Sequence, residues 1–145
     1  MPLTIERLQE SDLDQALRIE QECFRFPWKR QFFVADLNRP ESLCLAARAE
    51  GRLLGYAVVW RTEDELHLAN IAVDPEERHL GIGEKLLAAV IGTGHELSAT
   101  RIYLEVRRSN SIAQQFYRKH GFFQTYTRRE YYPDKEDALV LEREL

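Results

Sequence analysis

Two glycines and an arginine at a predicted strand-to-helix corner have the residue types needed to hold a phosphate group. The run Arg78-His79-Leu80-Gly81-Ile82-Gly83 separates the apolar segment "LANIAV" from the helical segment "EKLLAAVI". Glycine lets backbone N–H groups approach an anion, and the start of a helix adds partial positive charge. A dinucleotide fingerprint would need a third glycine where Leu86 stands, and a nucleoside-triphosphate loop would need Gly-Lys-Ser or Gly-Lys-Thr. The corner therefore fits neither of these two loops, and by itself it is also compatible with an ordinary turn.

A carboxylate and a phenol further along the chain have the types needed for proton transfer. Glu105 stands inside "IYLEV", on the opposite face of a predicted strand from Ile102 and Leu104. A carboxylate in the middle of a strand is costly to bury unless it is paired or used. Tyr117 lies in the segment "SIAQQFYRKHG", beside Phe116. From these residues alone, an ion pair for Glu105 and core packing for Tyr117 are the alternatives to catalytic roles.

The elements that must position these residues follow from hydrophobic spacing and from helix and turn signals. Helices are expected over residues 11–23, 28–38, 83–97 and 111–121. Three antiparallel strands are expected within residues 42–73, the first two joined at Glu50-Gly51, and further strands over 101–106, 122–132 and 136–144. This order predicts a mixed sheet with helices on both faces.

Length and composition exclude several classes of protein. With 145 residues, 44% of them hydrophobic, the chain suits one domain over residues 1–145 with a single core. A net charge of −4 argues against direct nucleic-acid binding, which depends on a basic face. The apolar runs are too short to span a membrane, and the N-terminal residues are too charged for a signal peptide. We therefore expect a cytoplasmic protein without a membrane anchor, and the histidines and cysteines show no metal-ligand spacing.

Three ordered motifs together resemble the GNAT superfamily of acetyl-coenzyme A-dependent N-acetyltransferases. They are "NIAVDPEERHLGIGEKLL" at 70–87, "IYLEVRRSNSIAQQFYRKHGF" at 102–122 and "RREYYPDKEDALVLE" at 128–142. The resemblance reaches back to "FPW" at 26–28, so it covers most of the chain. It implies the α/β (α+β) GNAT fold, in which about four helices flank a mixed, mostly antiparallel sheet of about six to seven strands. A cleft would open between the strand ending at Val73 and the strand containing Glu105. Gly92 and Gly94 depart from this expectation, because glycine weakens a helix interior.

The resemblance also implies the binding site of acetyl-coenzyme A, with no metal. Backbone N–H groups of the corner would hold the pyrophosphate, and Arg78 would add positive charge beside it. A bulge in the preceding strand would open the cleft for pantetheine, and a strand N–H would polarise the thioester carbonyl. The residues implied for coenzyme binding are Ile71, Ala72, Val73, Arg78, His79, Leu80, Gly81, Ile82, Gly83, Glu84 and Asn110.

Within the same resemblance, Glu105 is the general base that accepts the proton of the amine, and Tyr117 is the general acid at the coenzyme sulfur. An unperturbed phenol has a pKa of about 10, so it stays protonated at neutral pH and is able to donate to a thiolate. Tyr131 and Tyr132 would line the entrance used by a peptide N-terminus. The implied substrate is the N-terminal amine of a protein that begins with alanine or another small residue, a small-subunit ribosomal protein.

The pKa values of amines support an N-terminal substrate. An α-amino group has a pKa of about 7.7–8.0 and a lysine amine about 10.4, so deprotonation at pH 7 costs roughly 1 and roughly 4.6 kcal/mol respectively. Acidic residues near Tyr132, among them Asp134 and Glu136, would suit a basic peptide. Two alternatives stay open at this point: acetylation of lysines or small amines, and a noncatalytic module that binds acyl-coenzyme A. The oligomeric state is not predicted by the sequence.

Overall fold

The fold is a seven-stranded open sheet with two helices on each face. The computed structural model describes residues 2–78 and 80–145. The strands are β1 (Thr4–Arg7), β2 (Ser42–Ala49), β3 (Arg52–Thr62), β4 (Glu65–Val73), β5 (Arg101–Arg107), β6 (Phe123–Arg128) and β7 (Ala138–Glu144). The helices are α1 (Leu13–Cys23), α2 (Arg30–Leu37), α3 (Ile82–Glu96) and α4 (Ser111–Lys119), with short 3-10 turns at Glu10–Asp12 and Pro75–Glu77.

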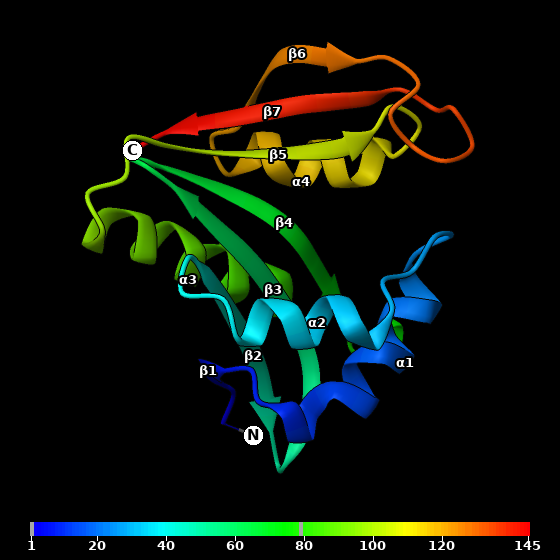
Figure 1. Cartoon of the computed structure of the whole chain (residues 1–145), viewed down its shortest axis with the longest axis vertical. Helices are drawn as coiled ribbons and strands as arrows, with labels where there is room; N and C mark the ends of the chain where they lie inside the picture. Colours follow the sequence, from blue (N-terminus) through cyan, green and yellow to red (C-terminus); the bar gives the residue numbers. More distant parts are fainter. Residues whose placement is uncertain (1, 79) are drawn as a thin grey trace.

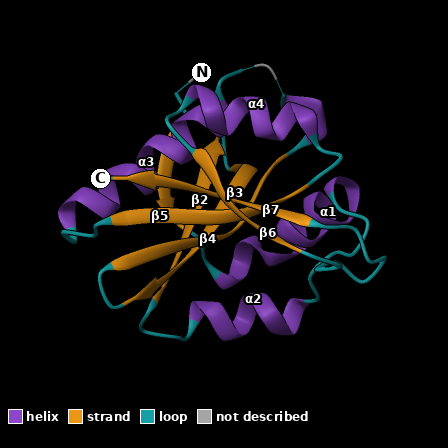
Figure 2. Ribbon diagram, turned by 90° about the horizontal axis from the view of Figure 1, so that it is seen from above, coloured by secondary structure: helices purple, strands orange, loops and turns teal. Residues whose placement is uncertain are grey.

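The strand order in the sheet is β1-β2-β3-β4-β5-β7-β6. β4 and β5 pair in parallel, whereas the other neighbouring strands are antiparallel. Figure 2 shows α1 and α2 on one face of the sheet and α3 and α4 on the other. A buried apolar cluster lies under each pair of helices. The mixed, mostly antiparallel sheet expected from the sequence is therefore confirmed.

Two elements differ from the sequence-based expectation. β1 was not predicted, because its four residues are mostly exposed and carry two charges, which gives no apolar alternation to read. β6 ends at Arg128, so Tyr131 and Tyr132 lie in the loop before β7 and not in a strand. This loop contains Glu130 with φ 48°, a left-handed conformation that interrupts a strand.

Close packing explains a glycine that the sequence pattern left unexplained. A Cβ at Gly94, in the interior of α3, would lie 2.5 Å from Leu145 Cδ1 and 3.4 Å from Leu66 Cδ1. Glycine lowers the stability of a helix interior, but here its lack of a side chain allows α3 to pack closely against the sheet. Gly92 lies two residues earlier in the same helix, and a Cβ there would have no other atom within 4 Å. Packing therefore does not require a glycine at this position.

Gly55 in β3 has a stricter requirement, because a Cβ there would lie 2.8 Å from the backbone oxygen of Ala72 in β4. We predict that Gly55→Ala lowers the free energy of unfolding by about 1–3 kcal/mol, as expected for an overpacked site next to rigid backbone. The matched variant Gly92→Ala should raise it, by up to about 1 kcal/mol, because alanine is the better helix former. Urea unfolding of both variants checks this, and equal stability of Gly55→Ala and the parent chain would contradict it.

Candidate functional site

The two central strands pair over a short length and then diverge. β4 and β5 are hydrogen-bonded only from Glu65–His67 to Arg101–Tyr103. The register between β3 and β4 shifts between Val58 and Val59, which leaves Ala69 as an extra residue in β4. An extra residue bends a strand and increases its local twist. Figure 1 shows β4 and β5 separating beyond this point.

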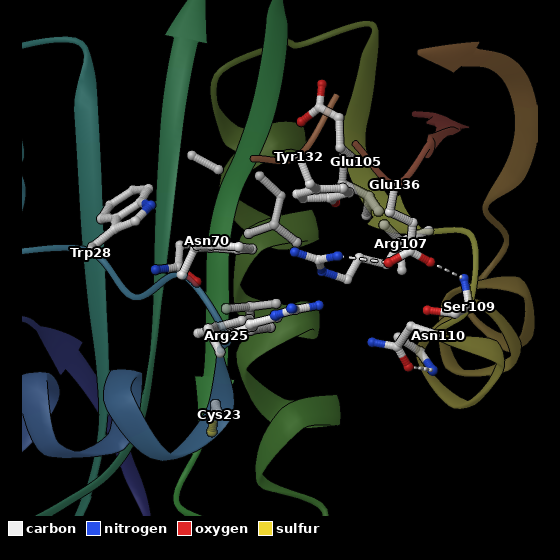
Figure 3. A pocket seen from close by; sticks show the side chains of 18 of the residues that line it. Cys23, Arg25, Trp28, Asn70, Glu105, Arg107, Ser109, Asn110, Tyr132 and Glu136 are labelled. Atoms are coloured by element: carbon white, nitrogen blue, oxygen red, sulfur yellow. Dashed lines mark hydrogen bonds and ion pairs between the residues drawn. The ribbon is translucent and has the colours of Figure 1, made fainter. Parts of the chain in front are cut away.

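A pocket of about 570 Å³ fills this opening. Its walls come from β4, β5, the start of α4, the segment after α1 and the loop between β6 and β7, as Figure 3 shows in part. Of the residues predicted to bind the coenzyme or substrate or to act in catalysis, five line it: Ile71, Glu105, Asn110, Tyr117 and Tyr132. The divergence of the strands therefore brings together residues that are up to 61 positions apart, from Ile71 to Tyr132.

The edge of β4 that faces the opening carries backbone groups that β3 does not use. The carbonyl oxygen of Val73 accepts a hydrogen bond from Cys23 Sγ at 3.4 Å, whereas the N–H of Asp74 donates to Leu54 of β3. Backbone groups of successive residues point to alternate edges of a strand. The N–H groups of Ile71 and Val73 therefore point toward the opening.

Glu105 is held by two partners on the face of the sheet that carries α1 and α2. Its Oε1 lies 2.6 Å from Nε2 of His67, and its Oε2 accepts from Nε of Arg128 at 3.3 Å. Burial acts to raise the pKa of Glu105, but His67 and Arg128 outweigh it, so the pKa lies below its ordinary value. Glu105 thus makes the ion pair that the sequence offered as one alternative, and it also lines the pocket.

Tyr117 approaches the pocket from the other side of the sheet. Its ring packs against Phe116 and Phe122 at centroid distances of 5.3 and 5.7 Å. Burial, with a smaller contribution from Tyr132, raises the pKa of Tyr117, so the phenol keeps its proton at neutral pH. Its hydroxyl has no hydrogen-bond partner within the described part of the chain.

The glycine corner lies beside the pocket and does not line it. Gly81 adopts φ 75° and caps the start of α3, so the first N–H groups of this helix have no intrahelical acceptor. Gly83 packs against α4, with 3.6 Å between its would-be Cβ and Phe116 Cζ. Nη2 of Arg78 lies 3.5 Å from Cys23 Sγ. The prediction for His79 falls outside the described residues, and those for Leu80, Ile82 and Glu84 fall in this corner.

Asn110 caps the start of α4. Its side-chain oxygen accepts from the N–H of Ala113 at 3.1 Å, and it also lines the pocket. Of the tyrosine pair, Tyr132 lines the pocket and Tyr131 is 49% exposed and lies outside its lining. Their rings meet edge to face at 5.1 Å.

Arg107 neutralises acidic side chains that the sequence offered as contacts for a basic peptide. Its Nη1 donates to Asp134 at 2.9 Å and to Glu136 at 2.6 Å, and its guanidinium lies 4.1 Å from the ring centroid of Tyr132. Arg25 also bonds to Asp134, at 2.9 Å, and so links the two loops that flank the pocket. Figure 3 shows Arg25 and Arg107 projecting into the same space.

The model of the acetyltransferase (GNAT) family matches residues 13–122 of this chain. The chain belongs to the GNAT family of acetyltransferases. Enzymes of this family use acetyl-coenzyme A as the acetyl donor.

Relatives of known activity cover nearly the whole of this GNAT chain. The ribosomal protein bS18-alanine N-acetyltransferase of Escherichia coli (strain K12) is 34% identical over 141 residues, 95% of each chain. The crystal structure of the ribosomal-protein-S18-alanine N-acetyltransferase from Escherichia coli matches with a TM-score of 0.91 over 99% of this chain and 94% of that one. The N-alpha-acetyltransferase of Sulfurisphaera tokodaii is 33% identical over 144 residues, 90% of this chain and 86% of that protein. The PaiA N-acetyltransferase of Thermoplasma acidophilum, solved with coenzyme A, is 19% identical and shares the fold, with a TM-score of 0.85 over both full chains.

Two further observations concern the described residues of this enzyme. In residues 2–78 and 80–145, no three His, Cys, Asp or Glu side chains are arranged to hold a metal ion. None of the helices described in the same ranges is long and apolar enough to cross a membrane.

Sequence reasoning missed three residues at the pocket, two that line it and one that contacts Glu105 beside it. His67, which reads as an ordinary strand residue, contacts Glu105 and stacks on Tyr103 at 4.5 Å. Glu20 and Asn70 both line the pocket and hydrogen-bond to each other at 2.8 Å. The sequence did carry a signal for two of them, since each is a polar residue at a position where the pattern calls for a buried apolar one. Glu20 lies on the buried face of α1, and Asn70 is a buried residue of β4.

The partners of Glu105 lead to a titration experiment on this enzyme. Arg128 lowers the pKa of Glu105, so Arg128→Gln should raise that pKa, since the effect of burial is then less opposed. The neighbouring Arg129 is exposed and makes no ion pair within the described residues. Arg129→Gln should therefore leave the pKa of Glu105 unchanged. Carboxyl ¹³C NMR titration measures both. Identical titration midpoints for Glu105 in the two variants would mean that Arg128 does not act on this carboxylate.

Proposed function

We propose that this enzyme transfers the acetyl group of acetyl-coenzyme A to the N-terminal α-amino group of a protein that begins with alanine or another small residue. The substrate that we infer is ribosomal protein bS18, which the names of its relatives specify, and we infer a cytoplasmic location for the enzyme. The observation that carries the proposal is that Glu105 and Tyr117 reach one pocket from opposite faces of the sheet. An acyl transfer to an amine needs a proton acceptor and a proton donor on either side of the reacting atoms.

The residues around the opening fit acetyl-coenzyme A. The first turn of α3, with Gly81 as its cap, offers unpaired N–H groups and the positive end of a helix dipole to a pyrophosphate. The N–H groups of Ile71 and Val73 are available to pantetheine or to the thioester carbonyl. We assign coenzyme binding to these backbone groups and to Ile71, Ala72, Val73, Arg78, His79, Leu80, Gly81, Ile82, Gly83, Glu84 and Asn110.

The proposed reaction moves two protons and exchanges one bond. The coenzyme supplies an acetyl thioester, and the amine nitrogen bonds to its carbonyl carbon as the carbon–sulfur bond breaks. Glu105 collects the proton that the nitrogen loses, through a water molecule, and Tyr117 gives its proton to the departing sulfur. A carboxylate of lowered pKa is sufficient here, because the nitrogen becomes strongly acidic once it has bonded to carbon. The raised pKa of Tyr117 keeps the acid in its donor form.

The entrance supports a peptide N-terminus as the substrate. Tyr132 and the pair of loops joined by Arg25 and Asp134 form the outer wall of the pocket. We assign Tyr131 and Tyr132 to substrate binding, with Tyr132 at the wall and Tyr131 at its exposed rim. An aromatic wall restricts the volume available to the first side chain, which favours alanine and other small residues.

The test uses a peptide with an N-terminal alanine and one internal lysine, and the same peptide with its N-terminus blocked. After incubation with the enzyme and acetyl-coenzyme A, mass spectrometry should find one acetyl group, on the α-amine of the free peptide. The blocked peptide should stay unmodified, because deprotonating lysine costs roughly 4.6 kcal/mol at pH 7. Equal labelling of lysine in both peptides would overturn the proposal.

Two variants separate enzymatic transfer from background chemistry in the same assay. Glu105→Gln and Tyr117→Phe should each reduce the rate by about 10²–10⁴-fold, the usual contribution of a general acid or base. Parent rates in both folded variants would remove these residues from the mechanism while leaving the substrate assignment intact.

A further inference from the structure

A buried carboxylate in the pocket has no role in the acid–base mechanism. Glu20 of α1 is 1% exposed, yet it belongs to the lining of the pocket. Its Oε1 accepts hydrogen bonds from the hydroxyl of Tyr56 and from Nδ2 of Asn70, the latter at 2.8 Å. Its Oε2 accepts from the backbone N–H of Trp28 at 2.9 Å. Four segments of the chain thus converge on this one side chain.

All three donors to Glu20 are neutral. Lys, Arg and His side chains of residues 2–78 and 80–145 make no ion pair with it. A buried carboxylate is costly unless its charge is balanced. The charge lies beside a cavity that a substrate enters, so a cationic group of the substrate is the partner that would balance it.

Glu20 also determines the orientation of Asn70. A carboxylate accepts hydrogen bonds and does not donate them, so the NH₂ group of Asn70 must face Glu20. Its oxygen Oδ1 then points the other way, and it has no partner among the residues that the structure describes. In Figure 3 the nitrogen of Asn70 lies on the side of Trp28 and its oxygen on the opposite side. Asn70 is 8% exposed, and among the described residues the one fully buried side-chain polar atom without a partner is Nε2 of His120. Oδ1 of Asn70 therefore keeps some exposed area, and it is an acceptor that a donor in the pocket can reach.

The bulge at Ala69 places Asn70 on the same face of the sheet as Glu105. Before the bulge, Leu66 and Leu68 belong to the apolar cluster under α3 and α4, whereas after it Ala72 belongs to the cluster under α1 and α2. Asn70, which bonds to α1, faces the latter helices as well. Glu105 does so too, through His67 and its neighbour Trp60. The two polar groups therefore border the opening from β4 and from β5.

We propose that Asn70 and Glu20 form the binding site for the positively charged α-amino group of the peptide substrate. Oδ1 of Asn70 accepts a hydrogen bond from the ammonium, and Glu20 holds that amide in place and supplies the balancing negative charge. This inference rests on the proposed function, since it concerns the amine that is acetylated. Asn70 contacts the substrate, whereas Glu20 is a positioning residue that acts through it.

A negative charge at this place favours the ammonium over the neutral amine. It therefore strengthens binding of the form that predominates at neutral pH. One ammonium proton then passes to solvent water before the nitrogen attacks, and Glu105 takes the second proton after the nitrogen has bonded to carbon. The expected effect of losing the site is a higher KM for the peptide with a smaller change in kcat.

The test compares an alanyl peptide with an analogue in which a propionyl group replaces the alanine, so that only the amine is missing. Calorimetric titration in the presence of coenzyme A measures both affinities. The parent enzyme should prefer the amine by about tenfold or more, as expected for a hydrogen bond to a charged group. In Asn70→Ala this preference should fall to within about twofold of unity, with the KM for acetyl-coenzyme A unchanged within about twofold.

Two further variants make the outcome specific. Asn38→Ala removes an exposed asparagine that bonds only to the Val34 carbonyl, and it should keep the full preference for the amine. Glu20→Gln keeps the volume but removes the charge and the fixed orientation, so it should lower the preference even if Asn70→Ala does not fold. A structural defect alone would weaken the peptide and its analogue equally and leave their ratio unchanged.

The possible failures are distinguishable. If the parent enzyme acetylates peptide N-termini and both Asn70→Ala and Glu20→Gln keep the parent preference, the inference is wrong and the proposed function stands. If the parent enzyme binds and acetylates no peptide N-terminus, the proposed function fails and this inference fails with it.

Discussion

The separation of β4 from β5 is the constraint on which the site depends. Two neighbouring strands of a sheet normally satisfy each other's backbone groups along their length. Here the parallel ladder covers only Glu65–His67 and Arg101–Tyr103. Beyond the extra residue Ala69, the N–H groups of Ile71 and Val73 point toward the opening in place of a strand, while the alternate groups pair with β3. Those groups are obligatory donors, so the fold itself creates a place where a ligand with carbonyl groups is stabilised.

Side chains around the opening hold its two walls in fixed positions. On the β4 wall, Glu20 joins α1, β3, β4 and the segment before α2 through hydrogen bonds from neutral donors. On the β5 wall, Arg107 joins the strand to the loop before β7 through Asp134 and Glu136. Burying charge in this way is costly, and the cost is offset where each group has several partners. The pocket is therefore largely preformed, which reduces the entropy lost when two substrates bind.

The sequence predicted the parts of the site that depend on local patterns. The corner at Gly81, the strand containing Glu105 and the helix containing Tyr117 each follow from spacing within about twenty residues, and the motif resemblance joined them. The contacts of Glu105 with His67 and of Glu20 with Asn70 span 38 and 50 positions, so no local pattern contains them. They arise from strand register, and a single extra residue such as Ala69 changes which face every later side chain occupies. Tyr131 shows the same limit, because the turn at Glu130 removes it from the strand that was expected over residues 122–132.

The central claim is that acetyl transfer takes place in the gap between β4 and β5. The most direct test is a crystal structure of the enzyme with a conjugate that links coenzyme A to the N-terminus of an alanyl peptide through the acetyl group. We expect the carbonyl oxygen of the linker to lie about 2.7–3.2 Å from the N–H nitrogen of Ile71 or Val73. The linked nitrogen should lie in the gap, between the wall of Asn70 and that of Glu105. A conjugate whose acetyl linker lies outside this gap would contradict the account.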